Sequence, residues 1–159
     1  MSAYGHLFIT DLYECNDDMV NEGDAAGEEL PANMSQPWAL MRGEDVPEAT
    51  AYVTTSWIHP RDGEDRVLWV KEHEHEYDEI LMFMGSDAEH PKDLGGTVFM
   101  TIGGEEHRLT TTSSVFIPGG VKHCPLGFYD VKRPIRFVAV AMSGNGYYMP
   151  ERAPRPAAD

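Results

Sequence analysis

The chain has 159 residues, 42% of them hydrophobic, which is enough for one domain with a sizeable core. Its 12 basic residues against 27 acidic ones give a formal net charge of −15, which disfavours nucleic acid and anionic membranes as partners. Cys15 and Cys124 are too few for a disulfide framework, and neither a secretory leader nor a run of ~20 apolar residues is present. We therefore expect a cytoplasmic protein without nucleic-acid or membrane partners.

The sequence begins with an acidic, loop-rich stretch and continues as a series of short β-strands. Residues 1–50 are predicted to form an N-terminal extension that packs on the main domain, with a short strand at 7–9 and a weak helix signal at 24–30. Residues 51–142 form the main domain and 143–159 a C-terminal tail. Branched and aromatic residues between turn signals predict strands over 51–58, 66–71, 73–84, 97–102, 107–110, 114–117, 123–129 and 135–141. Residues 97–110 are expected to form a hairpin and 85–96 a long connection, and the whole pattern suits an all-β sandwich or barrel.

Two histidines separated by a single residue make the segment from 73 to 79 the most informative part of the chain. His73, His75 and Glu79 occupy odd positions, and alternate side chains of a strand project to the same face. A helix would separate the two imidazoles by about 200°, so that they could not converge. A bulge that shifts the register by one residue would put Asp78 in place of Glu79. Glu79 is favoured over Asp78 as the carboxylate that shares a site with the imidazoles, because it lies an even number of residues from both histidines and so projects to the same face of a strand.

A second segment about forty residues later offers another imidazole. A short strand over 114–117 is followed by Pro118, Gly119 and Gly120, and His123 opens the next extended stretch. Proline fixes φ and glycine permits positive φ, so the three residues predict a tight turn. Such a turn between two strands is well suited to aiming one imidazole inward from a rigid frame.

Three imidazoles and one carboxylate form a ligand set suited to a divalent first-row transition metal. We expect His73, His75, Glu79 and His123 to bind one such ion per chain, with Fe²⁺ favoured and Mn²⁺, Ni²⁺, Zn²⁺ and Cu²⁺ as alternatives. The competing interpretation of the His-Glu-His-Glu run alone is a solvated, charged strand edge without metal. The second histidine segment favours the metal site over that interpretation.

These two segments resemble the two motifs of the cupin superfamily, over roughly residues 50–142. The first cupin motif, H-x-H with a glutamate and then a glycine, is matched by His73, His75, Glu79 and Gly85. The second, P-x-G-x-x-H, is matched by Pro118, Gly120 and His123. The sequence departs from the usual pattern at turns, where it has Val67, Thr112 and Gly127. The resemblance implies a small antiparallel β-barrel of jelly-roll type with a metal held inside its mouth.

Other side chains are candidates for proton transfer or for substrate binding. Tyr77 is expected to project to the same face of the strand as the ligands, and His59 ends another predicted strand. Either residue is a candidate catalytic residue. Cys124 follows a ligand directly and is expected to point away from the metal. His90 and His107 are expected on the surface. The basic residues that are candidates for binding an anionic substrate are Arg66, Lys71, Arg108, Lys122 and Arg136.

Four protein ligands leave open coordination positions for water, dioxygen or a chelating substrate. The favoured function is therefore a metal-dependent cupin enzyme, of dioxygenase type, that acts on a small organic molecule. One alternative is a redox-neutral metal-dependent isomerase, decarboxylase or lyase, and another is a non-catalytic cupin that binds a metal and a small molecule. We also expect a homodimer, because an edge strand of such a domain offers a pairing surface.

Overall fold

The computed structural model describes residues 3–16, 30–63 and 65–148, and ten strands lie in these ranges. In chain order they are β1 (Tyr13–Glu14), β2 (Trp38–Met41), β3 (Tyr52–Ile58), β4 (Val67–Val70), β5 (Asp78–Gly85), β6 (Asp93–Ile102), β7 (Glu105–Thr111), β8 (Ser113–Ile117), β9 (His123–Tyr129) and β10 (Ile135–Met142). Seven of the predicted strands are confirmed, with changes at their ends: 51–58, 66–71, 97–102, 107–110, 114–117, 123–129 and 135–141. None of the described helices is long and apolar enough to cross a membrane.

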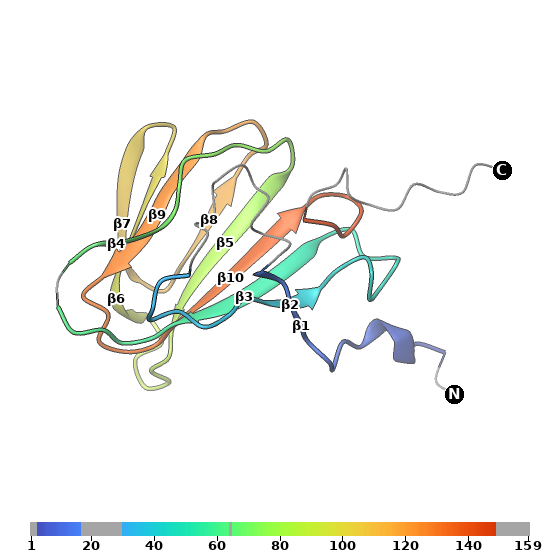
Figure 1. The fold of residues 1–159 in the computed structure, drawn as a ribbon, viewed down its shortest axis with the longest axis horizontal. Helices are drawn as coiled ribbons and strands as arrows, with labels where there is room; N and C mark the ends of the chain where they lie inside the picture. Colours follow the sequence, from blue (N-terminus) through green and yellow to red (C-terminus); the bar gives the residue numbers. More distant parts are fainter. Residues whose placement is uncertain (1–2, 17–29, 64, 149–159) are drawn as a thin grey trace.

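The strands form two antiparallel sheets that face each other (Figure 1). One has six strands in the order β1-β2-β3-β10-β5-β8, and the other has four in the order β4-β9-β6-β7. In the described residues, hydrogen bonding does not continue from one sheet into the other, so the predicted jelly-roll barrel is not closed and its strands form a two-sheet sandwich. The all-β, antiparallel character of the prediction is confirmed.

The core lies between the two sheets and follows from the alternation of side chains along each strand. In β5 the residues Leu81 and Phe83 are buried, and in β10 the buried residues include Phe137. Phe137 meets Trp69 of the opposite sheet edge to face, with ring centroids 4.8 Å apart. Burying a side chain of this size contributes about 1.5–3 kcal/mol, so these contacts hold the two sheets together.

The turn between β6 and β7 follows the sequence signal closely. Gly103 and Gly104 both have positive φ, 57° and 86°, as a two-residue hairpin turn requires. The connection before this hairpin is shorter than predicted, because β6 already begins at Asp93 and only residues 86–92 link it to β5. The predicted hairpin is confirmed, and the predicted long connection over 85–96 is corrected.

The N-terminal residues differ from the prediction in two places. The segment expected as a strand at 7–9 begins with a 3₁₀ turn, Gly5–Leu7, in which the N–H groups of Leu7 and Phe8 donate to the carbonyls of Tyr4 and Gly5. Strands β1 and β2 were not predicted, and they lengthen the six-stranded sheet beyond β3. The helix signal at 24–30 and the predicted tail over 143–159 fall largely outside the described residues. The division into an extension, a main domain and a tail stays a prediction.

Candidate metal centre

The three imidazoles of the two histidine segments meet at one end of the sandwich. One ring nitrogen each of His73, His75 and His123 lies within 4.8 Å of the corresponding nitrogens of the other two. His73 and His123 also pair through their backbones, since each donates its N–H to the carbonyl of the other at 3.0 Å. The convergence is therefore fixed by main-chain hydrogen bonds as well as by side-chain packing.

The segment that carries His73 and His75 is not the continuous strand that was predicted over 73–84. Strand β5 begins only at Asp78, and residues 71–77 before it are irregular apart from the bridge at His73. The burial pattern nevertheless alternates, with His73, His75 and Tyr77 more buried than the residues between them. The predicted strand is corrected, while the alternation of side chains that it implied is present.

All three imidazoles hold their protons on the nitrogen that faces the backbone. Nδ1 of each ring donates to a carbonyl two residues away: His73 to Lys71 at 3.0 Å, His75 to Tyr77 at 2.7 Å and His123 to Val121 at 2.9 Å. A carbonyl oxygen can only accept, so Nδ1 carries the proton and Nε2 keeps its lone pair. Hydrogen bonds of this kind to backbone carbonyls orient metal-binding histidines in proteins.

Glu79 supplies a buried carboxylate beside the imidazoles. It lies in β5 with 5% of its surface exposed, and its Oε2 is 3.6 Å from Nε2 of His75 and 3.6 Å from Nε2 of His123. The neighbouring Asp78 points outward, where its Oδ1 accepts a hydrogen bond from the N–H of Gly119. Of the two carboxylates weighed in the sequence, Glu79 is therefore the one directed toward the histidines.

The burial of His123 makes the group of side chains suitable for a cation. Its Nε2 is buried and has no hydrogen-bond partner. Desolvation by burial lowers the pKa of His123 below its ordinary value, which keeps the ring neutral near pH 7. A neutral ring with an inward lone pair beside a buried carboxylate is the state that a divalent metal requires. The residues present thus fit the metal expected from the sequence.

The turn before β9 is fastened directly to the segment that carries the first two histidines. The N–H of Gly120 donates to the carbonyl of His75 at 2.8 Å, and the N–H of Gly119 is held by Asp78. A Cβ added at Gly119 would lie 2.2 Å from the carbonyl oxygen of Glu76, and Gly120 has a φ of +76°. Both glycines are therefore required, one for close approach and one for its backbone conformation.

The two side chains expected to transfer protons lie in different places. The ring of Tyr77 stacks on that of His75, with centroids 4.0 Å apart and an angle of 7°, and Tyr77 also packs against the buried group around Tyr52. Tyr77 therefore touches a candidate ligand. His59 follows the end of β3 that pairs with Ile135, whereas Glu79 pairs with Ala141 at the opposite end of β10. The structure does not bring His59 to the imidazoles.

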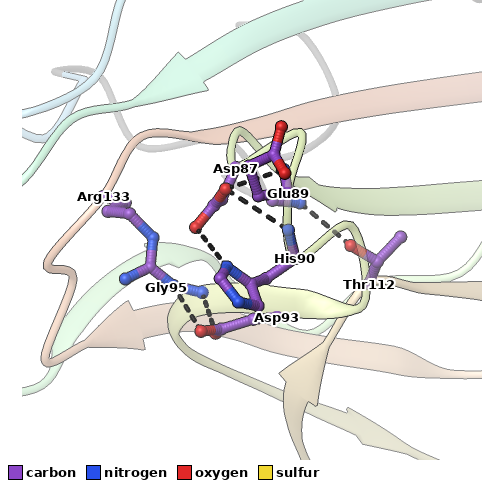
Figure 2. A network of polar contacts seen from close by, with 8 residues as sticks. Asp87, Glu89, His90, Asp93, Gly95, Thr112 and Arg133 are labelled. Carbon is purple, nitrogen blue, oxygen red and sulfur yellow. Dashed lines mark hydrogen bonds and ion pairs between the residues drawn. The ribbon is translucent and has the colours of Figure 1, made fainter.

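The other histidines expected on the surface are away from the centre. His90 lies beyond the far end of β5, where Asp87 accepts hydrogen bonds from its backbone N–H and its ring (Figure 2). Arg133 and Asp93 form an ion pair in the same network. His107 is an exposed residue of β7. Neither histidine contributes to the centre.

A small cavity of about 30 Å³ lies on the inner side of the centre. Besides His73, Glu79 and His123 it is lined by Trp69, Val70, Leu81, Cys124, Leu126, Phe137, Ala139 and Tyr148. The volume holds about two molecules of the size of water. No pattern in the sequence marked Trp69, Phe137 or Tyr148 as cavity residues, because their positions in the cavity depend on how the sheets pack.

Cys124 does not point away from the centre as expected. It lines the cavity together with His123, although the two residues are adjacent. The register between β6 and β9 shifts between the pairs Ile102–His123 and Met100–Leu126, which leaves one extra residue in β9, and Cys124 has a φ of +67°. A bulge of this kind breaks the alternation of side chains, so that two successive residues face inward.

None of the described basic residues lines the cavity. Arg66 pairs with Glu106 and lies over the ring of Phe99, and Arg136 donates to Thr55 beside Trp57. Lys122 is exposed, with its Nζ 4.0 Å from Glu72, and Lys71 and Arg108 are exposed as well. The five candidates for binding an anion therefore face away from the cavity.

Fold and site together define an all-β sandwich protein with a candidate metal centre of three histidines and a glutamate. No family model matches the sequence, and no curated protein matches it. Solved structures with a similar fold include cupins. A cupin-2 domain from Rhodospirillum rubrum is 15% identical over 73% of this chain and 66% of that chain, with a TM-score of 0.45.

Two further structures are similar at the same level. A predicted oxalate decarboxylase from Thermotoga maritima is 17% identical over 67% of this chain and 77% of its own, with a TM-score of 0.46. A cupin from Shewanella frigidimarina described as RmlC-like is 12% identical over 81% of this chain and 91% of its own, with a TM-score of 0.44. Two of these three structures are described as cupins. Similarity at this level assigns no activity, so the function is argued from the site itself.

Proposed function

We propose that this chain is a metal-dependent cupin enzyme of dioxygenase type that oxidises a small organic molecule. The observation that carries the proposal is the convergence of three imidazoles, each with its proton held at Nδ1, with two of them 3.6 Å from a buried carboxylate beside an apolar cavity. His73, His75, Glu79 and His123 would hold the ion. A set of three nitrogens and one oxygen suits Fe²⁺ and leaves one or two positions of a five- or six-coordinate ion open.

The lining of the cavity favours oxygen chemistry over isomerisation, decarboxylation or elimination. Those reactions need a side chain placed to move a proton, most often histidine or a carboxylate. Among the described lining residues, histidines and a carboxylate occur only in the ligand set, and the remaining groups that can ionise are Cys124 and Tyr148. The walls are otherwise hydrocarbon, and a volume of about 30 Å³ suits an uncharged gas such as dioxygen.

The protein's own groups have defined tasks in this proposal. The carbonyls of Lys71, Tyr77 and Val121 fix the imidazoles, and the apolar walls exclude bulk water from the inner side of the centre. When bound, Fe²⁺ would provide a redox-active centre at which dioxygen and an organic molecule can react. The organic molecule would supply all four electrons and both oxygen atoms would enter the product, so that no external reductant is needed.

Oxygen consumption by metal-loaded protein tests the proposal. The protein is loaded with Fe²⁺ without oxygen and mixed with catechols or diketones in an oxygen electrode, and ¹⁸O₂ is used to follow both atoms into the product. We expect one dioxygen consumed per product molecule, and loss of this activity in His123→Ala. The control is His107→Ala, which changes an exposed histidine outside the centre. Turnover that does not require oxygen, or tight binding without turnover, would contradict the proposal.

A further inference from the structure

The charge around the candidate metal centre restricts the substrate further. The inner walls carry no countercharge for an anion, because the described lining contains neither lysine nor arginine. Sites that bind carboxylates or phosphates usually place an arginine or a lysine against them. A substrate carboxylate turned toward these walls without binding the metal would thus lose its water and meet only hydrocarbon, at a large cost in desolvation.

The outer side of the centre is acidic. Each residue that alternates with an expected ligand carries a carboxylate, and these residues are Glu72, Glu74, Glu76 and Asp78. All four are exposed. Because neighbouring residues are about 3.8 Å apart at Cα, these charges lie within a distance of the order of one Debye length, about 10 Å at 0.1 M salt, from the imidazoles.

Two lysines offset only part of this negative charge. Lys71 and Lys122 are the basic residues closest in sequence to the ligands, and Lys122 already lies 4.0 Å from Glu72. The rest of the chain adds to the repulsion, since the formal net charge is −15. An approaching anion would therefore be repelled near the segment that carries His73 and His75, and it would find no countercharge on the inner walls.

We infer that the substrate is a small, uncharged molecule with an apolar body, which reaches the metal through its own oxygen atoms and carries no additional carboxylate or phosphate. The inference rests on the proposed function, because it assumes a metal held by His73, His75, Glu79 and His123. It names the substrate class from two independent features, the hydrocarbon lining and the acidic outer side.

A matched pair of ligands tests this inference on the full chain. The protein is loaded with Co²⁺, whose visible absorption bands report changes in coordination, and is titrated with catechol and with 3,4-dihydroxybenzoate, which differ by one carboxylate. We expect catechol to bind at least about tenfold more tightly at low salt, and added salt to narrow the difference. The uncharged 2,4-pentanedione serves as a second probe of the same class.

Charge reversal on the outer side gives a matched set of variants. Glu74→Lys and Glu76→Lys are expected to strengthen the binding of 3,4-dihydroxybenzoate several-fold while leaving catechol nearly unchanged. The control is Glu89→Lys, an exposed position at the far end of the sandwich (Figure 2), which should leave both affinities unchanged. An unchanged ratio of the two affinities in Glu74→Lys and Glu76→Lys would count against the role of these carboxylates and overturn the inference.

The outcomes separate this inference from the proposed function. If Co²⁺ bands appear and the carboxylate-bearing ligand binds as tightly as catechol, or if neither uncharged probe moves the bands, the substrate class is wrong while the metal centre stands. If no Co²⁺ bands appear in the intact chain, or if the same bands appear in His123→Ala, the proposed metal centre is absent and both statements fall.

Discussion

The position of the protons on three imidazoles decides what this end of the sandwich can bind. Because Nδ1 donates to a carbonyl in each of His73, His75 and His123, the lone pairs at Nε2 are left for a ligand. Removing a carbonyl partner of a metal-binding histidine usually costs 10–100-fold in affinity, on the order of 1–3 kcal/mol. Loss of a ligand itself should cost at least as much.

We therefore predict that His123→Ala lowers metal affinity by at least about 100-fold. Isothermal titration with Zn²⁺ and element analysis of the purified protein measure the effect. The exposed His107→Ala should bind metal like the unchanged chain. Full metal content in His123→Ala would show that His123 is not a ligand.

Tyr77 acts on the centre through the ring of His75. The two rings stack with centroids 4.0 Å apart, and an aromatic pair contributes about 0.5–1.5 kcal/mol. We predict that Tyr77→Leu lowers metal affinity by about 2–10-fold, because the plane of His75 is less well fixed, while Tyr77→Phe keeps the affinity of the unchanged chain. Equal losses in both variants would instead point to a role of the Tyr77 hydroxyl.

At the scale of elements, the contact between the 118–120 turn and the 73–79 segment joins the two halves of the centre. Gly119→Ala would place a Cβ 2.2 Å from the carbonyl of Glu76, so the turn must move away. We predict a loss of stability of about 1–3 kcal/mol in urea unfolding, together with weaker metal binding. The control is Gly63→Ala, where φ is +97° and no atom lies within 4 Å. That variant should lose stability through backbone strain alone and keep its metal affinity.

At the scale of the whole molecule, a bound metal should stabilise the fold. The ligands come from the segment before β5, from β5 itself and from β9, which belong to two different sheets. Metal at 100 times its dissociation constant contributes about 2.7 kcal/mol, which corresponds to a rise in Tm of about 5–10 °C. Thermal unfolding with Zn²⁺ and with a chelator measures this rise. The same rise in His123→Ala would place the stabilising metal elsewhere.

The expected homodimer also belongs to this scale. Large apolar side chains that are exposed lie mainly in the N-terminal residues and at the adjoining edge of the six-stranded sheet: Tyr4, Leu7, Phe8, Leu12, Tyr13 and Trp38. Since two copies repel each other through their negative charge, we predict that the dimer strengthens as salt is raised. Light scattering measures the mass, and Trp38→Glu should shift it toward the monomer. A monomer at micromolar concentration and high salt would contradict the prediction.

Much of the fold could be predicted because strand signals are local. Branched residues in β3 and β10 and the two glycines between β6 and β7 specify extended segments and a turn without reference to distant residues. Strand β2 was missed because its four residues give a weak signal. The predicted jelly-roll barrel was confirmed in its antiparallel strands but not in its closure, because closure depends on pairing between edge strands, which no local pattern describes.

By itself, the sequence determined which side chains near His73 turn inward, because alternate residues of an extended chain face opposite sides even where no regular strand forms. Only the tertiary structure decided the rest. It placed His59 at the far end of β3, turned Cys124 into the cavity through a bulge and brought Tyr148 to its wall. The physical reason is that the side to which a side chain projects is set by the local backbone conformation. The distance between two segments that are far apart in sequence depends instead on how the two sheets pack.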